Sequence, residues 1–262
     1  CIFWKPKGKI MNNIKIIVGL AAMLLMPNVN AAIIGLDATI RDFKSSHADM
    51  ESTIGGLDTG AVNTTLGADG KPVYNAAGAG SAFHGAANFN QWYNDTAGVN
   101  LSTTKTINLE NSLADPGIYS FSSNSFFPID GELFGNEGRS HNYHFTLEMH
   151  TSFTYQGGED FSFTGDDDLW VFINDTLAVD LGGVHGATSG SVDLDTAGLG
   201  LVIGQDYSFD LFFAERHTSQ SNFNIQTSIL LNDNSVPEPS ILALMGFGLI
   251  GLGFARRKVR MS

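Results

Sequence analysis

The chain has 262 residues, with 27 acidic residues, 14 basic residues and a single cysteine, Cys1. Four basic residues precede residue 33 and four follow residue 255, which leaves six against all 27 acids and a net charge of −21 in between. Such a surface repels nucleic acid and anionic membranes. Because no cysteine follows Cys1, disulfides, thiol catalysis and cysteine metal sites are excluded from the rest of the chain.

Residues 11–32 are predicted to be a secretory signal peptide. Residues 11–15 form a short cationic leader, residues 16–26 an apolar core, and small residues around Ala31 offer a cleavage site. Residues 1–10 would then be an upstream translation artefact or, alternatively, part of a longer basic leader. Export is expected in either case.

Residues 33–235 are predicted to form one all-β domain, either a β-sandwich or a jelly-roll-like barrel. Alternating or β-branched and aromatic runs recur, separated by glycine-rich turns, at 141–150, 161–163, 169–181, 191–194, 207–213 and 223–231. Many short strands of this kind, with no sustained helical periodicity, favour such folds. Residues 55–80 are rich in Gly, Ala, Asn and Thr and are predicted to be a loop or insertion.

A hairpin is predicted where three aspartates, residues 166–168, open directly onto the apolar run Leu169–Ile173. A second apolar run follows at Leu177–Leu181, and pairing Ile173 with Leu177 matches the two runs without a gap. The loop would then be residues 174–176. Extending the ladder places residues 182–185 beside the aspartates.

The three adjacent carboxylates are expected to attract a cation. Partly buried neighbouring carboxylates repel each other by about 4 kcal/mol per close pair at an effective dielectric near 20. Calcium takes roughly six to eight oxygen ligands from carboxylates, amides and backbone carbonyls, and an aspartate run beside glycine-rich backbone offers that set. The spacing is not that of an EF-hand loop, and a solvated acidic turn is the alternative.

The C-terminal residues 236–262 resemble the PEP-CTERM sorting signal of Gram-negative bacteria. Its three parts occur in order: the motif Pro237-Glu238-Pro239, a short apolar run at 241–255 and the basic cluster at 256–260. The resemblance implies a transmembrane helix held transiently in the inner membrane. It also implies an exosortase that cuts near the motif and releases the protein to the cell surface or extracellular matrix. A simple tail anchor is the alternative reading.

The region from about Ala38 to Leu231 resembles the fibro-slime domain. Six blocks of that family follow in order: ATIRDF (38–43), FFPIDG (126–131), HNYHFT (141–146), FTGDDDLWVFIN (163–174), DLGGVH (180–185) and FFAERH (212–217). Fibro-slime domains occur in secreted matrix and adhesion proteins and are related to the PA14 β-sandwich. The resemblance therefore implies a PA14-like sandwich.

In PA14-type lectins a pair of adjacent aspartates binds calcium, which in turn holds sugar hydroxyls. The resemblance thus implies Asp166 and Asp167 as Ca²⁺ ligands, with Asn222 or a backbone carbonyl of the 219–224 loop completing the set. Asp168 departs from the lectin pair but is kept as a candidate ligand.

Four further residues are expected to share this end of the hairpin and contact a ligand. Gly183 and His185 extend the hairpin ladder, whereas Glu215 and Arg216 end a later strand. Arg216 could pair with an aspartate and Glu215 could serve the metal, but such a triplet is more often a structural ion pair at a strand end, which is the favoured interpretation. Trp170 is expected to pack in the core rather than stack on a sugar.

These features predict an exported matrix or adhesion protein that binds extracellular polysaccharide through calcium. A purely structural matrix protein, in which calcium only makes the loops rigid, is the first alternative. A glycoside hydrolase is the second, because two carboxylates at the right separation can hydrolyse a glycoside. No separate acid, nucleophile elbow or zinc helix is marked by the sequence, so a non-catalytic module is favoured.

Overall fold

The computed structural model describes residues 31–234 and confirms the all-β prediction. The described part contains one short helix, α2 (Ala86–Phe89), and ten strands: β1 (Ile33–Phe43), β2 (Asn100–Asn111), β3 (Tyr119–Ser123), β4 (Phe145–Thr154), β5 (Asp160–Asp166), β6 (Asp168–Ile173), β7 (Thr176–Leu181), β8 (Thr188–Asp193), β9 (Asp206–Glu215) and β10 (Asn222–Thr227). Residues 1–10, the predicted signal peptide up to residue 30, and the sorting signal at 236–262 lie outside this part. Within it, no helix is both long and apolar enough to cross a membrane.

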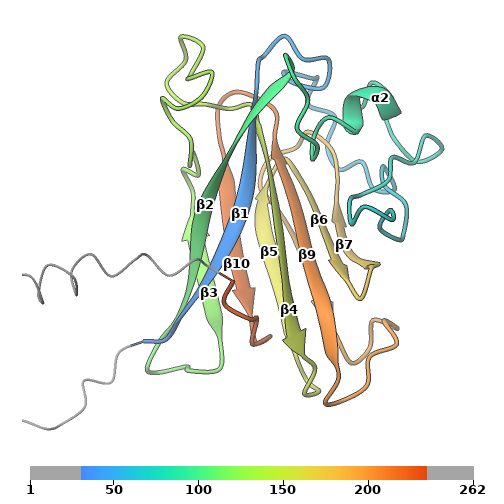
Figure 1. Ribbon diagram of the computed structural model, residues 1–262, viewed down its shortest axis with the longest axis vertical. Coiled ribbons are helices and arrows are strands. Elements are labelled where there is room, and N and C mark those ends of the chain that lie inside the picture. The colour runs from blue at the N-terminus through green and yellow to red at the C-terminus, as the bar shows by residue number, and fades with distance from the viewer. Residues whose placement is uncertain (1–30, 235–262) are drawn as a thin grey trace, which may run out of the picture. The chain divides into compact units, whose positions relative to one another are not determined.

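The strands form one antiparallel sheet in the order β7-β6-β9-β4-β1-β2-β3-β10-β5-β8 (Figure 1). The two end strands face each other, because a Cβ on Gly190 of β8 would lie 2.9 Å from the Val179 side chain of β7. The sheet therefore curls around a single main core, as expected of a sandwich. β1, β2 and β3, which come first in the chain, lie between β4 and β10 and link the two halves.

Strand β6 is apolar on both faces because each face contacts a different core. Leu169, Val171 and Ile173 point into the main core, whereas Trp170 and Phe172 point to the outside of the sheet. There they meet a second apolar cluster contributed by residues 61–93, which includes Phe83, Phe89, Trp92 and Tyr93. A strand buried on both sides is expected to read as a continuous apolar run.

That second cluster belongs to the long connection between β1 and β2, residues 44–99, which includes α2 (Figure 1). The prediction of a loop at 55–80 is confirmed, since its only ladder contacts are isolated bridges such as Val62 to Tyr74. The whole connection, residues 44–99, buries aromatic side chains against β6 and β9, so it forms a second layer over the sheet.

The central hairpin is confirmed, but its loop is one residue shorter than predicted. Leu169 pairs with Leu181 and Val171 with Val179, as expected; a bulge after Val171 then pairs Phe172 with Leu177. The turn is the pair Asn174-Asp175, with φ of 51° and 59°. Two positive φ values match a two-residue turn whose twist suits the strands.

The strand predicted at 141–150 begins only at Phe145. Residues 141 and 142 are instead held by Asp130, which accepts hydrogen bonds from the Asn142 amide at 2.7 Å and faces the His141 ring at 2.6 Å. The apolar alternation is present in this segment, but the Asp130 side chain, and not a neighbouring strand, accepts the hydrogen bond of the Asn142 backbone amide.

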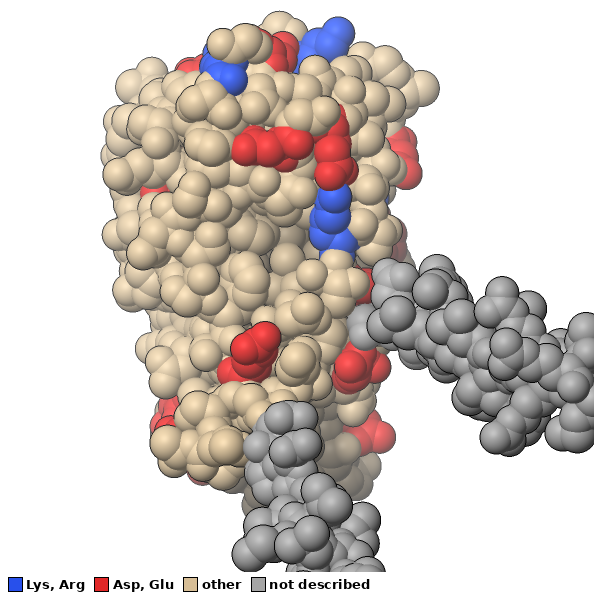
Figure 2. Space-filling view, turned by 90° about the vertical axis from the view of Figure 1, so that its left-hand side faces the viewer, with Lys and Arg blue, Asp and Glu red and all other residues tan. Residues whose placement is uncertain are grey.

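One flank of the domain shows how the acidic excess is distributed. Figure 2 shows small separate groups of acidic side chains there, with wide areas that carry no charge. On strands β3, β10, β5 and β8, two outward rows are made of uncharged polar residues: Ser122, Asn224, Thr164 and Ser189 in one, and Ser120, Gln226, Ser162 and Ser191 in the other. High net charge by itself therefore does not mark a site on this domain.

Candidate functional site

The aspartate run lies where the chain crosses from one half of the sheet to the other. Asp166 ends β5, which pairs with β10 and β8, and Asp168 begins β6, which pairs with β9 and β7. The peptide bond between Asp166 and Asp167 is cis. All three side chains are buried, with 4, 5 and 0% exposure in chain order. They are therefore not a solvated acidic turn.

Asp168 forms a fully buried ion pair with Arg216. The guanidinium Nε donates to Oδ2 at 2.6 Å and Nη2 donates to Oδ1 at 3.1 Å, while the Gly183 amide also donates to Oδ1 at 2.6 Å. Such a two-point pair is the strong form of an arginine–carboxylate contact. Since the guanidinium neutralises its charge, we assign Asp168 to this ion pair rather than to a metal.

Arg216 also joins the site to the long 44–99 loop. Its Nη1 donates to the carbonyls of Asp49 at 3.1 Å and Ala82 at 2.8 Å. Its guanidinium carbon lies 4.8 Å from the ring centroid of Phe83 and 4.7 Å from that of Trp92, a cation–π geometry. None of these four partners was anticipated from sequence, because they lie more than 120 residues away along the chain.

Asp166 and Asp167 are held by neutral donors. Asn222 donates to Asp166 through its backbone amide at 2.5 Å and its side-chain amide at 2.9 Å. The amides of His185 and Arg216 donate to Asp167 at 3.0 and 3.1 Å. Burial, together with the neighbouring charge of Asp168, raises the pKa of Asp167 to about 8.

Glu215 adds a further buried acid beside this pair. Burial and the charges of Asp167 and Asp166 raise its pKa well above the usual range. The nearby hydroxyl of buried Ser221 acts in the opposite direction and lowers that pKa, without making a regular hydrogen bond to Oε2. A buried carboxyl oxygen so poorly paired is uncommon and calls for an explanation, such as a bound ion.

The residues fit calcium better than a transition metal. Residues 31–234 contain no group of three or more His, Cys, Asp or Glu side chains arranged to hold a metal. A cation at Asp166 and Asp167 would therefore draw its remaining ligands from amide, carbonyl or water oxygens. Calcium accepts such neutral oxygens, whereas zinc sites require nitrogen, sulfur or further carboxylates.

The four residues expected to contact a ligand are brought together here, but they are buried. Glu215 is 1% exposed, Arg216 0% and His185 6%. A Cβ on Gly183 would lie 2.5 Å from the carbonyl oxygen of Gly56, so the 44–99 loop covers this position. In this arrangement the four residues contact neighbouring protein atoms and support the site from the protein interior. Trp170 is likewise buried, as expected.

A second polar cluster lies on the outer face of β1, β4 and β9. Glu148 of β4 contacts Arg41 of β1 at 2.9 Å and Lys71 of the long loop at 2.5 Å, and His150 contacts Asp210 of β9 at 2.7 Å. Although burial raises the pKa of Glu148, hydrogen bonds from His150 and Lys71 and the charge of Arg41 lower it to about 2. This cluster had no signal in the sequence.

Comparison with known proteins gives matches to two families. Residues 130–240 match the PA14 domain and residues 235–258 match the PEP-CTERM protein-sorting motif. The first match covers β4 to β10 and with them the whole aspartate run; β1, β2 and β3 lie outside it.

Two relatives come from Dictyostelium discoideum. The chain is 44% identical to protein psiR over 210 residues, which is 74% of this chain and 21% of psiR. It is 40% identical to protein psiC over 215 residues, 76% of this chain and 41% of psiC. The chain thus spans about a fifth to two fifths of the length of these relatives.

Two solved structures are also similar. The Epithelial Adhesin 9 A domain of Candida glabrata, crystallised with Galb1-3GlcNAc, gives a TM-score of 0.36 at 13% identity, covering 80% of this chain and 94% of that chain. The PA14 sugar-binding domain of an RTX adhesin gives 0.32 at 11% identity, covering 76% of this chain and 96% of that chain.

Proposed function

This chain carries a PA14 domain followed by a PEP-CTERM protein-sorting motif, and from that premise we propose that it is an exported, non-catalytic sugar-binding or adhesion protein whose aspartate pair holds calcium. The extended resemblance to fibro-slime domains, which are found in matrix and adhesion proteins, supports the same role. The ligand class we propose is extracellular polysaccharide.

The observation that carries the proposal is an excess of buried acidic groups, over cationic ones, at the aspartate pair. Four buried acids, Asp166, Asp167, Asp168 and Glu215, share one buried arginine, which is fully engaged with Asp168. Charges buried without a partner are costly, so proteins pair them, protonate them or bind a metal. Burial and, after it, the charge of Asp168 raise the pKa of Asp167, and a divalent cation at Asp166 and Asp167 would offset both effects by favouring the ionised form.

In this proposal each residue has a separate role. Asp166 and Asp167 hold the calcium, and Asn222 or a carbonyl of the 219–224 loop completes its ligands. Arg216 neutralises Asp168 and fixes the long loop against the site. A calcium ion held there would offer coordination to sugar hydroxyls. Glu215 has a poorly paired oxygen beside the pair, but it is 1% exposed and so lies out of reach of a glycosidic bond, which favours binding over glycoside hydrolysis.

Export is the second part of the proposal. The sorting motif supports processing by an exosortase near Pro237-Glu238-Pro239 and delivery to the cell surface or extracellular matrix. Mass spectrometry of protein recovered from the medium tests this, because a carboxyl terminus near Glu238 is expected. An intact basic tail, residues 256–260, would contradict release.

Calcium titration by calorimetry tests the metal site. Wild-type protein is expected to give calcium-dependent heat, and Asp167→Asn is expected to remove it. Asp160→Asn is the matched control, because Asp160 is exposed at the opposite end of β5. Equal isotherms for Asp167→Asn and wild type would remove the site.

A glycan array with and without chelator then separates the functions. Calcium-dependent capture of glycans supports the proposal. Calcium heat without glycan capture supports the structural alternative, which the burial of Gly183, His185, Glu215 and Arg216 favours. Release of sugar from a polysaccharide digest would instead support a hydrolase.

A further inference from the structure

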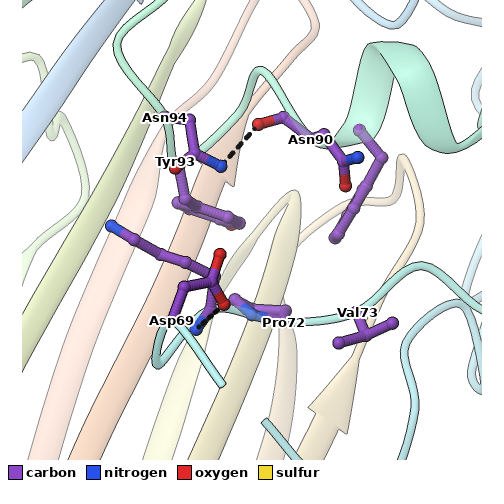
Figure 3. A pocket seen from close by; sticks show the side chains of 8 residues that line it. Asp69, Pro72, Val73, Asn90, Tyr93 and Asn94 are labelled. Carbon is purple, nitrogen blue, oxygen red and sulfur yellow. Dashed lines mark hydrogen bonds between the residues drawn. The ribbon is translucent and has the colours of Figure 1, made fainter. Parts of the chain in front are cut away.

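A small pocket lies on the outer side of the long loop, away from the aspartate run. Its volume is about 180 Å³, and it is formed by the 69–73 turn and by residues 89–94 that follow α2 (Figure 3). None of the residues of the aspartate site lines it. Two hydrogen bonds shape its walls: Asn94 Nδ2 donates to the Asn90 carbonyl at 2.8 Å, and the Lys71 amide donates to Asp69 Oδ1 at 3.2 Å.

Several polar atoms at this pocket remain available to a ligand. The side-chain amide of Asn90, Oδ1 of Asn94 and Oδ2 of Asp69 take part in none of the hydrogen bonds found within residues 31–234. Together they offer two N–H donors and three acceptor oxygens around one small volume. Hydroxyl groups, which donate and accept, match such a set.

The charge balance excludes an ionic ligand. The Lys71 ammonium is the one cation that lines the pocket, and it is held by Glu148 at 2.5 Å. Asp69 lies across the same turn and repels anions, whereas a single carboxylate beside an ammonium is a poor cation site. The ligand that fits is therefore neutral and polar.

Part of the pocket wall is apolar. Phe89, Tyr93 and Val73 line it, and Figure 3 shows Tyr93 and Val73 on opposite sides of the opening. Pockets that combine a few placed polar groups with apolar and aromatic walls are typical of small-molecule sites. A sugar ring presents both surfaces, with C–H groups on its faces and hydroxyls around its edge.

The volume limits the ligand to a single ring. It equals the share of about six liquid waters at roughly 30 Å³ each. It is also below the roughly 300 Å³ at which pockets for drug-sized ligands begin. One monosaccharide unit of a longer chain fits, with the rest of the chain in solvent.

A larger hollow of about 470 Å³ lies beside β7, and two of the polar residues that line it, Asp180 and Asn75, are already hydrogen-bonded. Both oxygens of Asp180 accept hydrogen bonds, from Gly60 at 2.7 Å and from Trp170 at 2.9 Å. Asn75 is engaged through its amide nitrogen by the Gly60 carbonyl and through its oxygen by Ala77. This hollow therefore serves as a comparison for the smaller one.

We propose that the pocket formed by Asp69, Asn90, Asn94 and Tyr93 is a calcium-independent subsite for one neutral monosaccharide unit of a glycan. It goes beyond the proposed function, because it uses a different surface and needs no metal. Two separate sugar contacts on one domain would raise the effective affinity for a polymer that reaches both.

Saturation-transfer NMR with glucose, galactose and N-acetylglucosamine, in the presence of EDTA, tests the subsite on the exported protein. At least one sugar is expected to give signal with wild type. Asn90→Leu is expected to weaken that binding at least tenfold, since it replaces hydroxyl-binding groups with an apolar side chain. Asn94→Leu should do the same by filling the pocket.

Asn63→Leu is the matched control, an equally exposed asparagine at the larger hollow beside β7. It should leave the EDTA-resistant signal unchanged, and circular dichroism should show all three variants folded. Absence of signal from every sugar in EDTA overturns the subsite, as does equal binding by Asn90→Leu and wild type. Asp167→Asn should keep this signal, so failure of the calcium site and failure of the subsite are distinguishable.

Discussion

Asp168 and Glu148 are both buried acids paired with an arginine, yet their surroundings differ. Asp168 is fully buried and shares one arginine with three neighbouring acids, and burial raises its pKa in spite of Arg216. Glu148 lies among Arg41, Lys71 and His150, and these partners outweigh its burial and lower its pKa to about 2.

The comparison shows that the number of oppositely charged partners, rather than burial alone, decides whether the charges of a buried cluster are neutralised. At Glu148 the cations match the acids and the cluster is explained as a structural link between β1, β4 and the long loop. At the aspartate run the acids exceed the cations, which leaves a deficit that a bound ion would fill. The two regions therefore predict different responses to substitution.

Arg216→Met is expected to produce the largest effect. It leaves Asp168 buried without a counter-charge and removes the contacts to Asp49 and Ala82, so the free energy of unfolding should fall by about 3–5 kcal/mol. Chemical denaturation measures this. The double variant Asp168→Asn, Arg216→Met removes both charges and should recover much of the loss. A loss below about 1 kcal/mol for the single variant would show that the ion pair does not fix the long loop against the site.

Glu148→Gln is expected to cost less, about 1–3 kcal/mol, because Arg41 keeps a second partner in Asp95 at 2.8 Å and Lys71 is partly exposed. The matched control is Glu132→Gln, which breaks the exposed pair with Lys105, at 2.6 Å, and should cost below about 1 kcal/mol. Equal losses for the two variants would contradict the view that Glu148 is a buried bridge. Urea unfolding curves are sufficient for the comparison.

The smallest effect is expected from pH. Burial lowers the pKa of His150, but Asp210 and Glu148 outweigh it and raise that pKa from 6.5 to about 9. A raised histidine pKa stabilises the folded state fully below pH 6.5, and this contribution is lost as pH rises through about 9. Thermal unfolding between pH 6 and 10 should show the decline. In His150→Gln the decline should be smaller but not absent, because the raised pKa of Asp167 also makes stability fall up to about pH 8; an unchanged slope would place its cause elsewhere.

Several features of the fold could be predicted from local sequence. The hairpin from Leu169 to Leu181 follows from two apolar runs and a short polar break, and the aspartates lie at its open end because they directly precede the first run. The loop at 55–80 was also evident from composition. The predicted turn is one residue too long, because a bulge after Val171 is set by the neighbouring strands and not by the pattern of apolar residues.

The pairing of Arg216 with one of the aspartates was predicted and is confirmed with Asp168, but its partners in the long loop could not be predicted, for a different reason. Asp49 and Ala82 contribute backbone carbonyls, which are present at every residue and carry no sequence signal. The same holds for the placement of β1 to β3 between β4 and β10, since strand order depends on contacts between distant segments.

By itself, the sequence determined the β class, the acidic character and the place of the aspartate run at the end of a buried strand, because these depend on neighbouring residues and periodicity. Only the tertiary structure decided that Asp168 is paired with Arg216, that Gly183, His185 and Glu215 are buried, and that a second pocket exists beside Asn90. The physical reason is that burial and charge pairing arise between segments far apart in the chain, 48 residues for Asp168 with Arg216 and 167 for Asp49 with Arg216, and a long loop packed on the sheet completes the burial.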